Sequence, residues 1–444
     1  MTIHRRSFLS GTAAFVAAGS LARVIGSASP VRARDCRPFT GYGDLVPDPK
    51  GLLDLPAGFS YHAFSLEGEA LSDGGFVPSN HDGTAAFSAG AAGIWLVRNH
   101  EIDSEDAAEG KLPVAPRKGS TYDPEASGGT TTLLVGHDRQ LKHHAVSLAG
   151  TVNNCAGGPT PWHTWLTCEE TDEVLTKPHG YIFEVDPRQG GNPEPIIAMG
   201  RFEHEAVSFD RRGTAYLTED ASEPFGCIYR FAPKQRNAGI GSLHAGGELS
   251  ALVVHGITTD LSIVQEAGTV LPVSWVPVPN PNPGPDDTSV REQAQSLGAT
   301  PIKKAEGTWT GVDGSIWFVA SYASGPDAED PEDVTVAAHS GQIWRYDPRA
   351  KTIELVTIFP VGSPYDGPDN ITASPHGFAV ACTDGEDDQW LIGIGNEGGT
   401  FPFARNAQSD VEFTGATFSP DGETLFANIQ EPGVTFAIWG PWQR

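Results

Sequence analysis

A thiol and two carboxylates stand side by side in the sequence at Cys168, Glu169 and Glu170. The residues from Trp162 to Cys168 are aromatic and β-branched, which predicts a strand that ends at these three side chains. Alternation along a strand places Cys168 and Glu170 on one side and Glu169 on the other, unless the strand bulges. A thiolate beside carboxylates suits iron better than magnesium or calcium alone. The plain alternative is a buried cysteine followed by two solvated glutamates.

Other acidic residues also stand at the ends of predicted strands. Glu101 ends the strand-like run that starts at Ile94, and Glu205 precedes a hairpin around Gly213. The remaining candidates at such positions are Glu219, Asp220, Glu306 and Asp384. Polar residues at strand ends are common in any protein. Their recurrence along the chain is what indicates a shared site.

Repeated hairpin patterns predict the fold that positions these residues. The same pattern occurs at 180–187, 226–233 and 341–348. Each stretch starts with a glycine, continues as a strand of alternating aromatic or aliphatic residues, and ends at a proline. A turn glycine followed by a short apolar strand recurs at 212–217, 313–318, 376–381 and 421–426. Such hairpins, with little helical periodicity between them, are typical of an all-β propeller, and we expect a single domain with six blades. The alternative is a pair of β-sandwich domains, but no linker of suitable composition separates two halves.

The first strands of propeller blades line a central channel, and one end of that channel is the usual place for a site. Carboxylates from nearly every blade would converge there: Glu101, Glu169, Glu205, Glu219 or Asp220, Glu306 and Asp384. Like charges this close do not all stay ionised without cations. The sequence therefore predicts bound metals or strongly raised pKa values at the channel end.

The first 33 residues predict an export signal. Arg5 and Arg6 precede an uncharged run from Gly11 to Ala22, and 31–33 is a plausible cleavage site, as in twin-arginine signals. The apolar run is too short to span a membrane, and no later stretch of about 20 apolar residues follows. We expect residues 34–444 to be a propeller domain without an integral membrane segment. We also expect the twin-arginine export machinery to carry it, already folded, to the periplasm or the medium.

The charge balance is strongly acidic and excludes several classes of partner. The chain has 29 basic and 56 acidic residues, and four of the arginines lie in residues 1–33, which leaves 25 against 56 and a net charge of −31. Such a surface repels nucleic acid and anionic membranes. An anionic substrate would need a locally positive site made of metal ions, arginine or lysine. The five cysteines are widely spread in the sequence and form no disulfide scaffold. Separately, we expect the protein to be a monomer.

With these residues in view, the sequence resembles the PhoX-type alkaline phosphatases and their shorter relatives with the same domain. The matching phrases run in order along nearly the whole chain after the signal. They are Asp82-Gly83, Arg98-Asn99-His100-Glu101, Asn154-Cys155-Ala156-Gly157-Gly158 with Thr160-Pro161-Trp162, Leu166-Thr167-Cys168-Glu169-Glu170, Gly200-Arg201-Phe202 with His204-Glu205, Thr218-Glu219-Asp220, Glu306-Gly307, Pro368-Asp369-Asn370, and Phe418-Ser419-Pro420-Asp421-Gly422 with Asn428-Ile429-Gln430 and Pro432-Gly433.

The resemblance implies a six-bladed propeller that hydrolyses phosphate monoesters at a central cluster of ferric iron and calcium. It implies that Cys168 is an iron ligand. It further implies a set of carboxylate ligands to the metals, namely Glu169, Glu205, Asp220 and Glu306, together with Glu101 and Asp384. Lys303 or Lys304 is close enough to Glu306 in sequence to hold a phosphoryl oxygen. We expect Lys304 and Glu306 to be the catalytic residues.

Two positions depart from the family pattern. Lys304 stands where the larger phosphatases carry an arginine, so a point charge replaces a two-pronged clamp. Glu431 stands where the family usually has a histidine, which adds negative charge. Two other functions stay open on the sequence alone. One is a calcium-dependent propeller lactonase or esterase of the gluconolactonase kind, which needs no thiolate. The other is a non-catalytic propeller that uses metals for stability and binds a partner.

Overall fold

The structure is a computed structural model that describes residues 40–222 and 224–443. The predicted export signal, residues 1–33, lies outside the described residues. Pro38–Arg444 forms one compact unit. None of the helices in the described part of the chain is long and apolar enough to cross a membrane.

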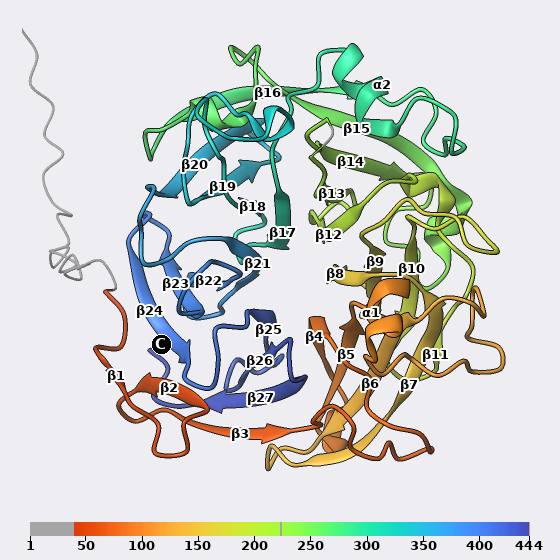
Figure 1. Cartoon of the computed structure of the whole chain (residues 1–444), viewed down its shortest axis with the longest axis vertical. Helices are drawn as coiled ribbons and strands as arrows, with labels where there is room; N and C mark the ends of the chain where they lie inside the picture. Colours follow the sequence, from red (N-terminus) through yellow and green to blue (C-terminus); the bar gives the residue numbers. More distant parts are fainter. Residues whose placement is uncertain (1–39, 223, 444) are drawn as a thin grey trace, which may run out of the picture. The chain divides into compact units, whose positions relative to one another are not determined.

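Antiparallel meanders of four strands are the repeating unit of the fold, and they surround a common centre (Figure 1). Meander one consists of β4 (His81–Ser88), β5 (Ile94–His100), β6 (Gly128–Val135) and β7 (Leu141–Thr151). Meander two consists of β8 (Asn154–Pro159), β9 (Trp165–Glu169), β10 (Ile182–Asp186) and β11 (Gly190–Gly191). Meander three consists of β12 (His204–Phe209), β13 (Ala215–Glu219), β14 (Ile228–Pro233) and β15 (Gly247–Val254).

The second half of the chain continues this pattern. Meander four consists of β17 (Ala305–Thr310), β18 (Ile316–Ala320), β19 (Gly341–Asp347) and β20 (Thr352–Phe359). Meander five consists of β21 (Pro368–Ala373), β22 (Phe378–Thr383), β23 (Trp390–Gly395) and β24 (Thr400–Asn406). Meander six consists of β25 (Phe413–Phe418), β26 (Leu425–Ile429), β27 (Val434–Trp439) and β3 (Ser60–Phe64). The expected β-propeller is confirmed.

Strand β3 closes the ring. It lies early in the chain, yet it pairs antiparallel with β27 and supplies the outer strand of meander six, with Phe64 opposite Thr435. The first strand of each meander contacts the first strand of the next, and β25 contacts β4. Closure of this kind leaves few free sheet edges and holds the inner strands in a fixed circle.

The remaining strands extend the meanders at their outer strands, and the helices lie in the connections. Strand β16 (Val270–Pro277) pairs with both β15 and β20 and so joins meanders three and four, while β2 (Leu53–Pro56) and β1 (Leu45–Val46) extend meander five. The two α-helices of the described chain are α1 (Ser104–Glu109) and α2 (Val290–Ser296). Five short 3₁₀ helices lie in its connections, at Gly90–Ala92, Ile197–Met199, Ser242–Ala245, Leu261–Ile263 and Pro331–Asp333.

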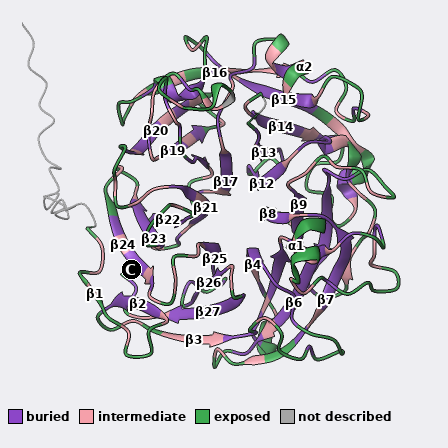
Figure 2. Ribbon diagram, viewed as in Figure 1, coloured by how far each residue is buried: buried purple, intermediate pink, exposed green. Residues whose placement is uncertain are grey.

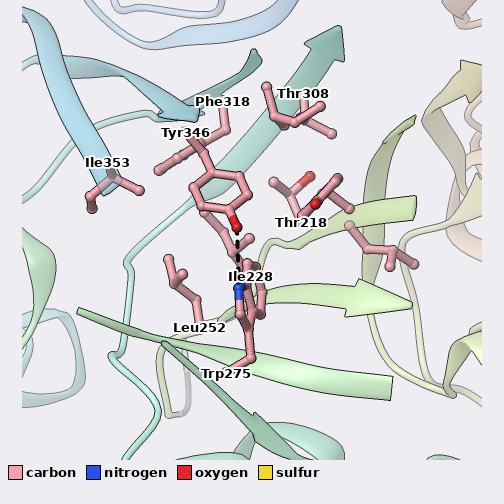
Figure 3. Close-up of a pocket in the computed structure, with 11 residues that line it drawn as sticks. Thr218, Ile228, Leu252, Trp275, Thr308, Phe318, Tyr346 and Ile353 are labelled. Atoms are coloured by element: carbon pink, nitrogen blue, oxygen red, sulfur yellow. Dashed lines mark hydrogen bonds between the residues drawn. The ribbon is translucent and has the colours of Figure 1, made fainter. Parts of the chain in front are cut away.

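The hydrophobic core lies between neighbouring meanders. Figure 2 shows the strands mostly buried and the connecting loops mostly exposed. Large side chains such as Trp165, Phe183 and Trp344 are fully buried there. One small pocket in this core, between meanders three and four, is shown in Figure 3; its side chains are mainly apolar, and Trp275 Nε1 donates a hydrogen bond to the Tyr346 hydroxyl at 3.4 Å. It contains none of the acidic candidates, so the site lies elsewhere.

The centre of the ring is narrow because small residues line it. The residues around it come from all six inner strands and include Gly83, Ala156, Ala206, Gly307 and Ala416. A Cβ on Gly83 would lie 2.6 Å from the Ala156 Cα, and a Cβ on Gly307 would lie 2.7 Å from the Ile371 backbone nitrogen. The inner strands therefore approach one another backbone to backbone, which a larger side chain would prevent.

Candidate metal centre

Every inner strand has a β-bulge at the same place, shortly after it begins. The pairing with the second strand shifts between His81 and Thr84 in β4, and equivalent shifts occur in the other five inner strands. A bulge turns a side chain out of the regular alternation and re-aims it. The first residue inside each shift, here called the bulge position, is Asp82, Cys155, Glu205, Glu306, Asp369 or Gly415.

A second set of polar residues follows the second strand of each meander. These residues, here called the strand-end positions, come directly after β5, β9, β13, β18, β22 and β26, and they are Glu101, Glu170, Asp220, Ser321, Asp384 and Gln430. Because each second strand runs antiparallel to its inner strand, its end lies beside the bulge of that inner strand. The fold thus brings two sets of ligand-type side chains to one end of the central channel.

The two sets meet closely enough to bind metal. Among the described residues, three groups have ligand atoms that all lie within 4.8 Å of one another: Asp82 with Glu101 and Cys155, Cys155 with Glu170 and Glu205, and Glu205 with Glu306 and Asp369. The groups share Cys155 and Glu205, so they form one continuous cluster that spans meanders one to five. The sixth bulge position is Gly415, where a Cβ would lie 2.5 Å from the Asp82 carbonyl oxygen.

The sharpest sign of a bound cation is Glu205. Its side chain is completely buried, and neither carboxylate oxygen has a hydrogen-bond partner among the described residues. Leaving a buried charge without a partner is very costly, and proteins avoid it by pairing or by metal coordination. The donor set around Glu205, one thiol and several carboxylates, fits this requirement for metal.

Burial and mutual repulsion raise the pKa values throughout the cluster. Burial, and then the charges of neighbouring carboxylates, raise the pKa of Asp82, of Glu170, of Glu205 and of Glu306 well above the usual values. The same two causes raise the pKa of the Cys155 thiol. Without cations, the protonated forms of these groups are therefore favoured. Bound cations reverse this and favour carboxylates and a thiolate.

Lys304 is the basic residue that reaches the cluster. Its ammonium group lies 2.8 Å from a Glu306 oxygen and 2.9 Å from an Asp220 oxygen. Burial would lower the pKa of Lys304, but the charges of Glu306 and Asp220 outweigh burial and raise it. Lys303 instead pairs with Asp333 and donates to the Ser324 hydroxyl. Of the two lysines considered from the sequence, Lys304 is therefore the one at the site.

The structure does not place the Cys168 thiol in the cluster. The Cys168 thiol is buried in the hydrophobic core, where it clusters with Leu166, Ile182 and other apolar side chains. It belongs to none of the three close groups, and the thiol that does is Cys155. The reason is that Cys168 lies inside the regular strand β9, whereas Cys155 lies in the bulge of β8, which aims its side chain at the channel.

The Glu169 carboxylate also lies outside the three close groups, and the next residue, Glu170, belongs to one of them. Its carboxylate already accepts hydrogen bonds from the backbone nitrogens of Val152, Gly180 and Tyr181 at 2.9–3.0 Å and lies 2.6 Å from His179 Nδ1. This buried carboxylate is fully engaged in joining loops of meanders one and two. Glu170, the next residue, carries the ligand atom that belongs to the cluster.

The other predicted residues divide into two groups. Glu101, Glu205 and Glu306 lie in the close groups. Asp220 and Asp384 lie at the margin of the cluster. Asp220 forms an ion pair with Lys304. The negative charge of Asp384 raises the pKa of Asp369, as the second cause after burial. The ligand set drawn from the sequence left out Asp82, Cys155 and Asp369, as well as the buried acid Glu412 beside them. Glu170 was considered together with Cys168 but was not included in that set.

Gln430 and Glu431 show how the sixth meander contributes. The Gln430 amide donates hydrogen bonds to Asp82 at 3.2 Å and to Glu101 at 2.8 Å, which orients both carboxylates. Glu431, which stands where the family usually has a histidine, forms an ion pair with Lys111. Its added negative charge is therefore offset outside the cluster.

The chain is similar to known proteins in sequence and in fold. A family model described as alkaline phosphatase PhoX matches residues 40–433. No curated protein sequence matches the chain. Among solved structures, PhoX of Pseudomonas fluorescens, in complex with the transition-state analogue vanadate, is similar over 88% of this chain and 96% of its own, with 17% identity and a TM-score of 0.68. A gluconolactonase of Xanthomonas campestris is similar over 91% of this chain and 100% of its own, with 12% identity and a TM-score of 0.46.

Proposed function

This chain belongs to the PhoX alkaline phosphatase family and is a metal-dependent phosphoric monoester hydrolase. From that premise we propose that its active site is the cluster formed by the three close groups of ligand atoms. The observation that carries this proposal is Glu205, a completely buried carboxylate with no partner at the point where two ligand groups join. Glu205, the neighbouring carboxylates and the Cys155 thiol would together hold a cation there.

We propose that the site holds both ferric iron and calcium. The two groups that contain Cys155 combine a thiolate with carboxylates, a donor set that suits iron. The third group, Glu205 with Glu306 and Asp369, offers oxygen atoms alone, the ligands that calcium prefers. Asp220 and Asp384 stand where they can add further oxygen ligands at the margin.

The reaction transfers a phosphoryl group to water. The oxygen of water bonds to phosphorus, the ester P–O bond breaks, and the alcohol leaves with a proton. Bound cations supply charge neutralisation for the phosphoryl oxygens and activate the attacking oxygen. The chain's own part is to place these groups: the carboxylates and Cys155 fix the positions, and Gln430 orients Asp82 and Glu101.

Lys304 adds the positive charge that binds a phosphoryl oxygen. Its ammonium group, held between Asp220 and Glu306, remains protonated because those carboxylates raise its pKa. The Lys304 side chain is 25% exposed, so a substrate can reach it from solvent. Unlike an arginine it offers a point charge, which binds one oxygen without the two-pronged geometry.

Phosphate release from a chromogenic monoester tests the proposal. We expect the native protein to release phosphate, to lose this activity when a chelator removes its metals, and to regain it when iron and calcium are restored together. Elemental analysis that finds calcium without iron would favour the lactonase alternative. Full activity in the metal-stripped protein would contradict the proposal.

We also propose that the twin-arginine machinery exports the chain to the periplasm or the medium, on the basis of Arg5, Arg6 and the apolar run that follows. Replacing both arginines by lysine keeps the charge but removes the paired signal. The double variant should accumulate in the cytoplasm, as fractionation and immunoblotting would show. Export of the variant at the unchanged rate would overturn this proposal.

A further inference from the structure

A groove of about 790 Å³ lies beside the proposed active site, on the loops of meanders four and five. Tyr322 and Ser324 follow β18, His339 and Ser340 precede β19, and Val361 follows β20. Its remaining wall comes from the segment before β21 and the loop after β22. All these segments adjoin the same ends of their strands as the bulge positions, so the groove opens on the same side as the cluster.

The groove is continuous with the cluster at two points. Asp384 lines the groove, and its backbone nitrogen donates to the Gly367 carbonyl at 2.7 Å, two residues before Asp369. On the other side, the ring centroid of Tyr322 lies 6.0 Å from the Lys304 ammonium nitrogen. A phosphoryl group held at Lys304 would therefore direct its ester substituent towards this groove.

The charge in the groove has one sign. Its lining includes four carboxylates, those of Asp366, Asp384, Glu386 and Asp387, and none of the described residues that line it is a lysine or an arginine. Asp387 is exposed, and its side chain makes no hydrogen bond or ion pair to another described residue. An anionic substituent would meet repulsion here, while a cationic one would find partners.

The protonation state of His339 agrees with that charge. His339 is buried, its Nδ1 has no hydrogen-bond partner among the described residues, and burial lowers the pKa of His339 to about 4, so the ring is neutral. A hydrogen bond to the Ser321 backbone uses the other ring nitrogen, which leaves Nδ1 as an acceptor. Tyr322 is 41% exposed, and its ring centroid already lies 4.8 Å from the Lys303 ammonium nitrogen and 6.0 Å from that of Lys304, so the acidic end of the groove, away from Tyr322, is where a cation would bind. The acceptors therefore gather at the end of the groove formed by Asp366, Glu386 and Asp387, while the Lys303 ammonium group, which donates to the Ser324 hydroxyl at 3.0 Å, lies at the other end.

We infer that this groove holds the alcohol part of the phosphate monoester and selects alcohols that carry an amine over alcohols that carry a carboxylate or a second phosphate. This inference rests on the proposed function of the neighbouring cluster. The amine would face Asp366 and Asp387, and the buried His339, whose Nδ1 is unpaired, lines the same groove. Val361, which is 70% exposed, gives the groove an apolar border for the carbon chain.

Three monoesters of similar size test the inference with the metal-loaded protein: phosphoethanolamine, glycerol phosphate and 3-phosphoglycerate. We expect kcat/KM at low ionic strength to fall in that order, with at least about a fivefold difference between the first and the last. The difference should shrink in high salt, since salt screens exposed charges.

Asp387→Asn should reduce the ratio of phosphoethanolamine to 3-phosphoglycerate activity. Its control is Glu397→Gln, an exposed acid in the turn between β23 and β24 of the same meander, at the opposite end of the strands. The control changes the net charge equally and should keep the ratio of the unchanged protein. Equal kcat/KM for the three esters, or a ratio that Asp387→Asn leaves unchanged, would overturn the inference while hydrolysis itself upholds the proposed function. Failure to hydrolyse any of the three would overturn both.

Discussion

At the scale of single residues, two cysteines in neighbouring strands lie in different surroundings. Cys155 lies among Asp82, Glu101, Glu170 and Glu205, while Cys168 lies among apolar side chains. The adjacent pair of glutamates made Cys168 the more attractive ligand in the sequence. Adjacency in the sequence is misleading here, because Cys168 lies inside the regular strand β9 whereas Glu170 follows its end.

Lys304 gives the most direct test at this scale. Lys304→Met removes the charge that binds the phosphoryl oxygen, so kcat/KM should fall by about 10²–10³, the usual cost of losing one such group. Lys304→Arg restores the charge and adds the two-pronged geometry, and it should recover most of the activity. Steady-state kinetics with a chromogenic monoester would measure both variants.

Lys303→Met is the matched control for this pair. It removes the ion pair with Asp333 outside the cluster, and it should lower the thermal stability more than it lowers kcat. A Lys303→Met variant as inactive as Lys304→Met, or no recovery in Lys304→Arg, would contradict the role of Lys304.

At the scale of elements, the bulge explains which residues become ligands. The sequence predicted that acids just before a hairpin, such as Glu205 and Glu306, converge at the channel end, and the structure brings ligand atoms of these two within 4.8 Å of each other. It could not indicate the bulges themselves, since a bulge is a property of strand pairing. The signal available in the sequence was an acid or thiol followed by a small residue, as in Asp82-Gly83, Cys155-Ala156 and Glu306-Gly307. The small residue is needed because the inner strands approach so closely.

Gly83 tests this link between element and site. In Gly83→Ala the new Cβ would lie 2.6 Å from the Ala156 Cα and 2.8 Å from the Cys155 carbonyl oxygen, so the β8 bulge must move. We expect a loss of about 1–3 kcal/mol in the free energy of unfolding. Iron content and phosphatase activity should fall together.

Gly399→Ala serves as the comparison for Gly83→Ala. Gly399 has no atom within 4 Å of the added Cβ, and a surface change of this kind shifts stability by less than about 0.5 kcal/mol. Chemical denaturation and metal analysis would compare the two variants. If Gly83→Ala still binds iron, the exact position of the β8 bulge is not needed for metal binding, and this link between element and site is contradicted.

At the scale of the whole molecule, the repeated hairpins were sufficient to predict the propeller, because each hairpin carries its own turn glycine and apolar strand. The closure of the ring was not predictable in this way. Strand β3 pairs with β27 across almost the entire chain, and nothing in Ser60–Phe64 indicates so distant a partner. The closed circle is what brings side chains from five meanders to one cluster.

Metal removal should reverse the pH dependence of stability. A carboxyl group whose pKa is higher in the folded than in the unfolded chain stabilises the fold below the unfolded pKa, and this contribution is lost as the pH rises through the folded pKa. Burial and then the charge of Asp384 raise the pKa of Asp369 from 3.8 to about 7. The metal-free protein should therefore lose stability between about pH 4 and pH 7.

The metal-loaded protein should behave in the opposite way, because cations keep the ligands ionised and protons compete with them as the pH falls. At a free metal concentration of about 100 times Kd, each site adds about 2.7 kcal/mol to the free energy of unfolding. Thermal melting from pH 4 to pH 8, with and without chelator, measures the effect. Parallel curves in the two conditions would be inconsistent with metals at the buried carboxylates.

The most direct test of the central claim is X-ray absorption spectroscopy at the iron edge of the purified native protein. We predict a sulfur ligand in the iron shell that persists in Cys168→Ala and disappears in Cys155→Ala. A sulfur ligand that survives in Cys155→Ala and is lost in Cys168→Ala, or an iron-free native protein with full phosphatase activity, would contradict the account.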